Sequence, residues 1–336
     1  MSTILKTASL ITKPIYGGIG HILMFHRVCP PGRRAPGSSQ IETAPEQLEA
    51  IIRFFAEWHY DFVSLDDVCR MLQEKKAGRK FVAFTFDDGY ADVYTTAYPL
   101  LKRANVPFAV YLITDFPDNK AVLWWYLLDE LVTEESSIRF EWKGQPYSFD
   151  CSTPQDQAKA NATLKRLIKA TSPKEQPDLF DVLFTPHHVD LYQKTKALAL
   201  SWQQIEQLGT DDLVTVGAHT VTHPVLANLD GNEVREEISR SVQKIRAHLG
   251  KPVDHFAYPY GGLGEAGWRE VGIVKELDFE SAVTTRYGNI QWGHRQYLEC
   301  LPRLNVPALG NLDNLELAVN GLIPARKNRF KRLITC

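Results

Sequence analysis

The sequence predicts an α/β protein built on a parallel β-sheet, either open or closed into a barrel. Short runs rich in β-branched and aromatic residues alternate with helix-period segments along most of its 336 residues. Apolar residues make up 44% of the chain, enough for a large core, and charged residues make up 23%, as in ordinary globular proteins. Side chains suited to chemistry stand at or near the ends of the predicted strands, where parallel sheets place their sites.

Seven runs are predicted as strands, and amphipathic helices connect them. The strands are residues 21–26, 81–86, 107–113, 213–218, 254–259, 279–284 and 302–306. One helix begins at 43–46, where Thr-Ala-Pro-Glu is typical of a capping box with proline in the first turn. Its apolar stripe consists of Leu48, Ile51, Ile52 and Phe55. A second helix is predicted over 233–249 and ends before Gly250 and Pro252.

The alternation of strand and helix is interrupted between about 116 and 200. Residues 138–149 are predicted as a small hairpin with its turn at Lys143-Gly144, and two polar helices follow. Because the alternation resumes at Trp202, we interpret this stretch as an inserted α/β subdomain. The predicted organisation is an N-terminal extension (1–20), a main domain (21–310) with that insertion, and a basic C-terminal tail (311–336).

Composition limits the compartment and the partners of the chain. A net charge of −2 gives no argument for a nucleic acid partner, and the five cysteines, odd in number and without CxxC spacing, predict no disulfide framework. No apolar segment has the length of a membrane span, and no secretory h-region is seen, so we expect a cytoplasmic protein. The basic run 326–332 is either a solvated tail or a weak peripheral contact with anionic membrane lipid or a phosphorylated carrier.

Two adjacent carboxylates, Asp87 and Asp88, follow the strand 81–86 in the sequence Thr-Phe-Asp-Asp-Gly-Tyr. Successive side chains of a strand point in opposite directions, so the two acids can take different roles. One can bind a cation while the other handles protons. The structural alternative is that the pair caps a helix or forms an Asp-Gly turn.

Two histidines four residues apart, His219 and His223, lie far downstream in the sequence His-Thr-Val-Thr-His-Pro. With Asp88 they supply three ligands and leave coordination positions open for water and substrate. Alternatively they are a hydrogen-bonded loop pair. A zincin-type protease fits poorly, because Thr220 stands where that helix motif has its glutamate. A non-haem iron oxygenase also uses two His and one carboxylate, but the Asp doublet and the lack of a basic anchor for an oxoacid count against it.

A third segment, residues 255–262, ends a predicted strand in the sequence Tyr-Pro-Tyr-Gly-Gly. It is either an ordinary Pro/Gly turn or a substrate site, in which a backbone N–H near Tyr260 binds a developing oxyanion between aromatic walls. The predicted substrate-binding residues are His26, Tyr258, Pro259, Tyr260 and Gly261. For His26, which ends the first predicted strand, the alternative is that it only anchors the mouth of the barrel.

Together these motifs resemble the polysaccharide deacetylases with a NodB-homology domain (carbohydrate esterase family 4). The resemblance extends from the segment 21–28 (His-Ile-Leu-Met-Phe-His-Arg-Val) to the segment 301–306 (Leu-Pro-Arg-Leu-Asn-Val). It implies a distorted, seven-stranded (β/α) barrel that removes N- or O-acetyl groups from sugars. By resemblance, Asp87 is the catalytic base, and Asp88, His219 and His223 are the metal ligands.

The chain departs from the common family pattern at one position. Many members carry an arginine just before the Pro-Tyr-Gly step to orient the base, whereas this chain has Ala257 and Tyr258 there. Arg303 is the candidate replacement, with a surface arginine as the alternative. His294 is the candidate general acid for the departing amine, with an exposed loop histidine as the alternative.

The sequence therefore predicts a metal-dependent hydrolase that removes an N-acetyl, or alternatively an N-formyl or O-acetyl, group from an amino sugar. The expected cofactor is one divalent ion, Zn²⁺ or else Co²⁺, Ni²⁺ or Mn²⁺, because Asp with two His does not choose among them by ligand type. The expected substrate is an acetylated amino sugar or oligosaccharide, as a glycan precursor or a lipid-linked sugar. The competing interpretation is a catalytically silent sugar-binding protein of the same fold.

Overall fold

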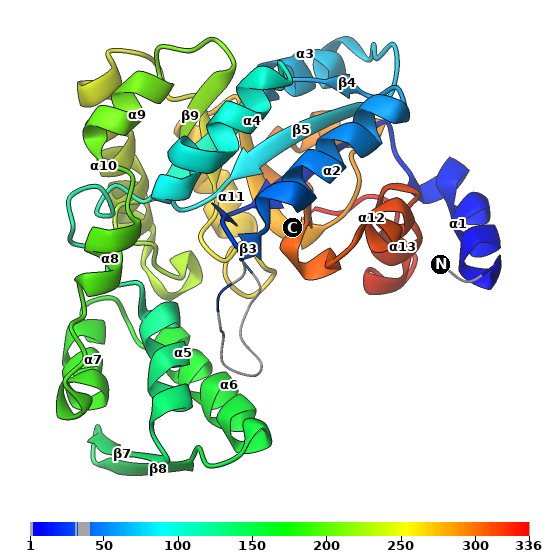
Figure 1. Cartoon of the computed structure of the whole chain (residues 1–336). Helices are drawn as coiled ribbons and strands as arrows, with labels where there is room; N and C mark the ends of the chain where they lie inside the picture. The colour runs from blue at the N-terminus through cyan, green and yellow to red at the C-terminus, as the bar shows by residue number, and fades with distance from the viewer. Residues whose placement is uncertain (1–2, 31, 33–40, 336) are drawn as a thin grey trace. The chain divides into compact units, whose positions relative to one another are not determined.

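A closed barrel of seven parallel strands forms the centre of the structure, a computed structural model that describes residues 3–30, 32 and 41–335. Around the barrel the order is β1, β12, β11, β10, β9, β6 and β5, and β5 pairs with β1 to close it. Figure 1 labels β5 and β9 among these strands. The strands are β1 (Gly20–Phe25), β5 (Phe81–Phe86), β6 (Phe108–Leu112), β9 (Val214–Ala218), β10 (His255–Ala257), β11 (Ser281–Tyr287) and β12 (Leu301–Asn305). The predicted barrel and its seven strands are confirmed, with β11 beginning and ending later than expected.

The register of the closing pair explains part of the sequence. β1 and β5 are paired over six residues, from Gly20 opposite Phe81 to Phe25 opposite Phe86, and both strands are buried along their whole length. Strands buried on both faces are continuous apolar runs. A Cβ on Gly20 would lie 2.4 Å from the ring of Phe81, so this position needs glycine. A short strand, β4 (Asp61–Phe62), pairs with the amino end of β5.

Helices connect the barrel strands. They are α2 (Pro45–Glu57), α3 (Leu65–Glu74), α4 (Tyr98–Arg103), α9 (Trp202–Leu208), α10 (Gly231–Leu249) and α11 (Trp268–Glu276). The expected stripe of α2 is buried, but the capping box is wrong: the N-cap residue is Ala44, and Thr43 belongs to β3 (Glu42–Thr43), which pairs with β2 (Arg27–Val28). In α10 the predicted end is confirmed by Gly250 at φ 62°, while the helix begins at Gly231, two residues before the expected start, with Asp230 as its N-cap.

Helices lie at both ends of the described chain. They are α1 (Thr3–Tyr16), α12 (Leu312–Val319) and α13 (Leu322–Lys327). The segment 311–336, predicted as a basic C-terminal tail, thus contains two helices, whose buried apolar residues are Leu315, Leu317, Ala318, Val319 and Ala325. The basic side chains of the run 326–332 are exposed to solvent, as the sequence suggested.

Residues Asp118–Ala199 form a second compact unit, whereas the main unit contains the described residues of the ranges 1–31, 41–117 and 200–336. The second unit consists of α5 (Trp124–Glu134), β7 (Ser137–Trp142), β8 (Gln145–Asp150), α6 (Pro154–Ala170), α7 (Gln176–Phe184) and α8 (Gln193–Leu198). The predicted hairpin is confirmed: β7 and β8 are antiparallel around Lys143 and Gly144, both at positive φ. Among the described residues no helix combines the length and apolar character of a membrane span.

Candidate metal centre and active site

The chain turns sharply where β5 ends, and this turn separates the two carboxylates. The Asp87 N–H still bonds to the Phe25 carbonyl at 3.0 Å, so Asp87 continues the β1–β5 ladder. Asp88 then has φ 75° and Gly89 has φ 92°, both in the left-handed region. This conformation is uncommon for a non-glycine residue and is often a feature of functional sites. Consequently Asp87 and Asp88 face different partners.

Asp88, His219 and His223 come together as a cluster of three metal-ligating groups. One oxygen, Asp88 Oδ1, lies 3.5 Å from His219 Nε2 and 3.7 Å from His223 Nε2. Around an ion with bonds of about 2.0–2.2 Å, tetrahedral ligand atoms stand roughly 3.4 Å apart. The three ligand atoms lie within 4.8 Å of one another, so the residues fit a divalent metal. The identity of such an ion is not fixed by this ligand set.

The ring of His219 is oriented by a hydrogen bond at the nitrogen that does not face Asp88. His219 follows β9, and its N–H continues the β6–β9 ladder by donating to the Leu112 carbonyl at 2.9 Å. Its ring Nδ1 lies 2.7 Å from the Ala257 carbonyl, which can only accept, so Nδ1 carries the proton. Nε2 therefore presents a lone pair toward Asp88, as a metal ligand requires.

A carboxylate from α10 holds the loop that carries His223. Glu237 Oε2 accepts the Val221 and Thr222 N–H groups, each at 3.0 Å, and Oε1 accepts the Thr222 hydroxyl at 3.0 Å. Within the loop, the Thr220 hydroxyl accepts the His223 N–H at 3.0 Å, while Thr220 and His223 both have positive φ. Sequence reasoning missed Glu237, because no local motif marks it and its helical position gives no sign of the loop it meets.

The electrostatics of the cluster favour the protonation states that a metal needs. Burial, with the neighbouring His219 charge, lowers the pKa of His223 to about 3, so this imidazole is neutral near pH 7. Burial opposes ionisation of Asp88, but the electrostatic influence of the neighbouring His219, His26 and His223 rings outweighs it and lowers the pKa of Asp88 well below its usual range. Neutral imidazoles and an ionised carboxylate are the forms that coordinate cations.

Asp87 forms a bidentate ion pair with Arg303. Arg303 Nη1 lies 2.7 Å from Asp87 Oδ1, and Nη2 lies 2.6 Å from Oδ2. Arg303 also donates from Nε to the Thr284 carbonyl and from Nη1 to the Thr85 hydroxyl, both at 3.0 Å. The exposed fraction of the side chain is 0% for Arg303 and 3% for Asp87. The fork geometry fixes both the position and the plane of the Asp87 carboxylate.

Burial by itself would raise the pKa of Asp87, but the charge and hydrogen bonds of Arg303 outweigh it, so the pKa is lowered. Asp87 is therefore ionised at neutral pH although it is buried. A buried carboxylate needs such a partner to remain charged. The arrangement can supply an anionic proton acceptor beside the cluster of Asp88, His219 and His223.

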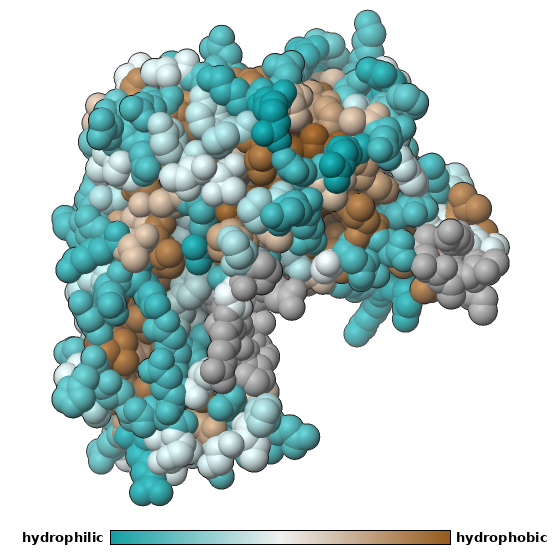
Figure 2. All heavy atoms as spheres, viewed as in Figure 1, coloured by the Kyte–Doolittle hydropathy of each residue, from teal (hydrophilic) through white to brown (hydrophobic). Residues whose placement is uncertain are grey.

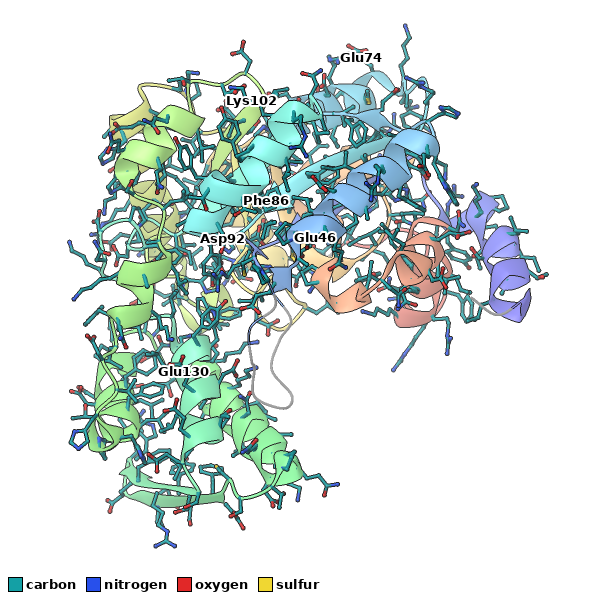
Figure 3. All side chains as sticks on the ribbon, viewed as in Figure 1. Glu46, Glu74, Phe86, Asp92, Lys102 and Glu130 are labelled. Atoms are coloured by element: carbon teal, nitrogen blue, oxygen red, sulfur yellow. The ribbon has the colours of Figure 1, made fainter. Side chains whose placement is uncertain are left out.

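His26 lies near both carboxylates, and its charge contributes to the lowered pKa values of Asp87 and Asp88. Its Nδ1 is buried and has no hydrogen-bond partner among the described residues. Arg27, the residue after His26, is held by Asp92, which follows β5: Arg27 Nε donates to Asp92 Oδ2 at 2.7 Å. Figure 3 labels Asp92 near Phe86, the last residue of β5. His26 is thus held at this end of the barrel, near the two carboxylates.

The turn after β10 brings Tyr260 to the cluster but not Tyr258. The ring centroids of Tyr260 and His223 are 4.6 Å apart, and Tyr260 and Gly261 have φ 59° and 60°. Pro259, between them and β10, is buried in the turn. Tyr258 is fully buried, and its hydroxyl donates to the Glu299 carbonyl at 2.7 Å. Its side chain packs inside the main unit, and this placement does not support the predicted substrate contact.

His294 is not brought to the cluster. It is fully buried; its Nδ1 accepts the Gln291 N–H at 2.9 Å, and its Nε2 lies 3.0 Å from the Ile334 carbonyl. Burial lowers the pKa of His294 to about 4, so the ring is neutral at pH 7. Because both ring nitrogens are occupied by backbone groups, the structure does not support the general-acid role expected for His294.

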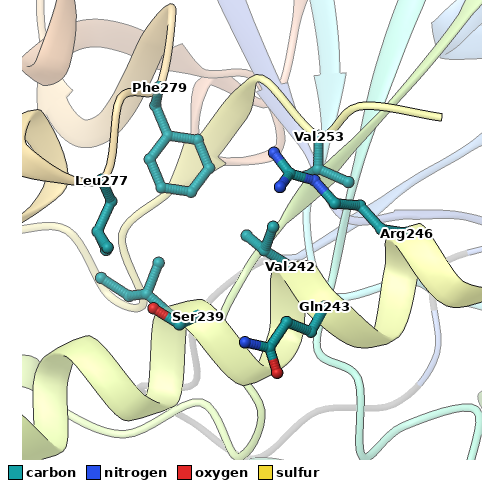
Figure 4. Close-up of a pocket in the computed structure, with 8 residues that line it drawn as sticks. Ser239, Val242, Gln243, Arg246, Val253, Leu277 and Phe279 are labelled. Atoms are coloured by element: carbon teal, nitrogen blue, oxygen red, sulfur yellow. The ribbon is translucent and has the colours of Figure 1, made fainter.

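Two other features of the main unit lie apart from this cluster. A pocket of ≈ 190 Å³ is lined by residues of α10, among them Val242 and Arg246, and by Leu277 and Phe279 (Figure 4); it contains none of the cluster residues. A second His–carboxylate group contains Asp66, His255 and Glu280. Both ring nitrogens of His255 have hydrogen-bond partners: Nδ1 lies 2.8 Å from Ser281 Oγ, and Nε2 lies 2.7 Å from Asp66 Oδ1. We therefore interpret this group as structural.

Comparison with known proteins gives one consistent similarity. The model of the polysaccharide deacetylase family matches residues 74–271. The chain is 29% identical over 148 residues to "Putative polysaccharide deacetylase YxkH" of Bacillus subtilis (strain 168), which covers 44% of this chain and 50% of that protein. This chain thus spans about half the length of that curated relative.

Solved structures share the fold at low sequence identity. The Streptococcus pyogenes deacetylase PplD in complex with acetate is 19% identical with a TM-score of 0.59, covering 89% of this chain and 97% of that one. IcaB from Ammonifex degensii is 19% identical with a TM-score of 0.55, covering 90% and 97%. The de-N-acetylase from Aggregatibacter actinomycetemcomitans is 15% identical with a TM-score of 0.56, covering 89% and 99%.

Proposed function

The chain belongs to the polysaccharide deacetylase family, and on that premise we propose that it is a metal-dependent hydrolase that removes an N-acetyl group from an amino sugar. One observation supports this most strongly: three metal-ligating groups, Asp88, His219 and His223, lie beside Asp87, a buried carboxylate kept ionised by Arg303. The set contains both a cation site and a proton acceptor. A silent sugar-binding protein would need neither.

The proposed cofactor is one divalent ion, Zn²⁺ or else Co²⁺, Ni²⁺ or Mn²⁺, held by Asp88, His219 and His223. When bound, the ion acts as a Lewis acid that acidifies water and polarises the acyl oxygen. His219 and His223 present neutral nitrogens to it, and Asp88 contributes the negative charge. The carbonyl of Ala257 and the carboxylate of Glu237 keep the two histidines in place.

The proposed base is Asp87, which accepts a proton from the attacking water at one of its carboxylate oxygens. Arg303 holds the carboxylate in a fixed plane, so no reorientation is needed when the proton arrives. The acyl carbon then gains a C–O bond, and its C–N bond to the sugar breaks. Since His294 is tied to backbone groups, we propose that Asp87 returns its proton to the departing amine. Acetate and the free amine are the products.

The turn that carries Tyr260 is the proposed contact for the developing oxyanion, because it lies against His223. His26 is proposed to contact the substrate because it lies near both carboxylates. The substrate class is an acetylated amino sugar in a glycan, a glycan precursor or a lipid-linked sugar. N-formyl and O-acetyl groups present the same acyl carbon and are alternative substrates.

Two single variants test this proposal. Asp87→Asn removes the proton acceptor but none of the three ligands, so it should keep the metal and abolish acetate release. His219→Ala removes a ligand and should lose both. The matched control is Asp66→Asn, in the structural His255 group, which should change neither. Metal content after reloading is measured by mass spectrometry, and acetate release is measured on acetylated chitooligosaccharides.

The proposal fails if Asp87→Asn retains full turnover, or if His219→Ala binds metal as tightly as the parent protein. Loss of metal in Asp66→Asn instead of His219→Ala would place the ion in the other cluster. Acetylated chitooligosaccharides are compared with N-formylated and O-acetylated sugars, so that the acyl group is identified from relative rates.

A further inference from the structure

The first helix and the C-terminal segment lie together on the main unit. α1 packs against α12 and α13. The Thr12 hydroxyl donates to the Asn320 carbonyl at 3.1 Å, and the Tyr16 hydroxyl donates to the Phe330 carbonyl at 3.2 Å. The rings of Tyr16 and Phe330 meet edge-on with centroids 6.3 Å apart. We therefore treat the outward side of α1 and of residues 326–332 as one feature, the α1–tail surface.

The helix α1 exposes three large apolar residues, whereas polar residues lie on its packed side. Ser9 is buried, and Thr12 is hydrogen bonded on the same side. The exposed apolar side chains are Leu10 (67%), Ile11 (65%), Ile15 (48%) and, from the C-terminal segment, Phe330 (64%). Figure 2 shows hydrophobic residues at the position of α1 at the edge of the main unit. An amphipathic helix normally buries its apolar face against the rest of the protein. The exposed apolar face of α1 therefore indicates an interaction with another molecule.

The same surface carries a dense positive charge. Five basic residues lie within 326–332, and all are exposed: Arg326, Lys327, Arg329, Lys331 and Arg332. The sequence has no Asp or Glu before Glu42 and none after Glu316. None of the five basic side chains pairs with a carboxylate in the part of the chain that the structure describes. This local charge contrasts with a net charge of −2 for the whole chain.

We propose that the α1–tail surface binds the face of an anionic lipid bilayer. Exposed aliphatic side chains beside a cluster of Lys and Arg are the combination that suits the interface between acyl chains and anionic headgroups. A second copy of this chain fits less well, because two such surfaces would oppose like charges. An acidic polymer would engage the cations, but it would leave Leu10, Ile11 and Ile15 uncovered.

The proposed surface lies at the end of the barrel opposite the metal cluster. α1 leads into β1 at Gly20, its amino end, whereas Asp87 and Asp88 follow the carboxyl end of β5, which is parallel to β1. Binding to a bilayer would therefore not cover the cluster. The proposal goes beyond hydrolysis and does not depend on it, so each can fail without the other.

The test is cosedimentation of the metal-loaded full chain with lipid vesicles. Vesicles of phosphatidylcholine alone are compared with vesicles that also contain phosphatidylglycerol. Arg329→Glu/Lys331→Glu reverses two charges on the surface, and Lys76→Glu/Arg139→Glu is a control with the same total charge change at exposed sites elsewhere. Leu10→Ser/Ile11→Ser removes apolar contacts at exposed positions, so the fold should be kept.

We expect binding to the anionic vesicles only. Each basic residue lost should lower the partition coefficient about fivefold, so the loss of two should lower it about 25-fold, and their reversal to glutamate should lower it further. Leu10→Ser/Ile11→Ser should lower it by about tenfold. The control pair should retain most binding, and about 1 M salt, where the screening length falls to about 3 Å, should weaken it strongly.

Three outcomes would overturn the proposal. The first is that the parent protein does not bind anionic vesicles, and the second is that the control pair loses as much vesicle binding as Arg329→Glu/Lys331→Glu. The third is that the protein binds heparin but not vesicles, and that Leu10→Ser/Ile11→Ser binds heparin equally well. A concentration-dependent dimer that Leu10→Ser/Ile11→Ser abolishes would instead identify the surface as a self-association face. Circular dichroism of each variant separates loss of the surface from loss of the fold.

Discussion

Replacing Arg303 with methionine should destabilise the protein mainly by stranding the charge of Asp87. The Asp87 side chain is 3% exposed, and its two oxygens accept the two terminal nitrogens of Arg303 at 2.6 and 2.7 Å. Removing one partner of a buried ion pair typically costs about 3–5 kcal/mol, because the remaining charge loses its compensation. Asp87→Asn should cost a similar amount, since it strands the fully buried guanidinium.

The double variant Asp87→Asn/Arg303→Met leaves neither charge in the interior. Its free energy of unfolding should therefore fall by less than the sum of the two single losses, with a coupling energy of about 2–3 kcal/mol. The hydrogen bonds from Arg303 to Thr284 and Thr85 are lost in both backgrounds, so they cancel in the cycle. The cycle thus isolates the Asp87–Arg303 pair.

The assay is urea unfolding followed by circular dichroism, with chelator present so that metal binding does not enter the comparison. Acetate release is measured separately after metal reloading. Arg303→Met should lower kcat/KM by a factor on the order of 10²–10⁴, the usual contribution of a positioned base. It should have no further effect in the Asp87→Asn background. Additivity of the two unfolding losses within about 0.5 kcal/mol would refute the ion-pair argument.

The remaining predictions concern the loops around the metal cluster. Glu237→Gln should weaken metal binding by about 10–100-fold, measured by competition with a chelating dye, because it loosens the loop of His223. Burial raises the pKa of Glu237, so the unfolding free energy of the parent relative to Glu237→Gln should fall as the pH rises above about 4, the ordinary pKa of a glutamate, and should level off above the raised folded pKa. Gly261→Ala should cost more than about 1 kcal/mol in urea unfolding and lower turnover, since φ is +60° and a Cβ would lie 2.6 Å from the Thr285 nitrogen; an unchanged midpoint would contradict this. Chelation should lower Tm, because an ion at a hundredfold excess over its Kd stabilises the fold by about 2.7 kcal/mol; His219→Ala should show no such shift.

Much of the fold was predictable because its signals are local. The buried strands β1 and β5 are continuous apolar runs, and the Lys143-Gly144 turn selects its hairpin through positive φ. The errors arose where long-range packing decides. Thr43 does not cap α2 because it is taken into the β2–β3 pair, and the C-terminal segment forms helices because its apolar residues reach the interior.

Arg303 and His294 were both proposed to fill gaps in the family pattern, and the structure places them differently. Arg303 lies on β12, where alternation puts it on the same side as Leu301, a member of the core cluster inside the barrel. A period of two could therefore have supported this residue. His294 lies in a short 3-10 helix (Trp292–Gln296), which has no comparable periodicity. Glu237 could not be found at all, because only the folded chain brings α10 to the loop 220–223.

The ion pair of Asp87 also constrains the chemistry. Arg303 keeps the carboxylate ionised at neutral pH, which secures the acceptor state, but a lowered pKa also makes Asp87 a weaker base. A weak base can take a proton readily only from an acidified donor. The three groups Asp88, His219 and His223 lie where a cation would supply that acidity. The lowered pKa of Asp87 thus suits a base that works beside a cation site. Turnover should require both, so loss of the Asp87 carboxylate or loss of the cation should each abolish it.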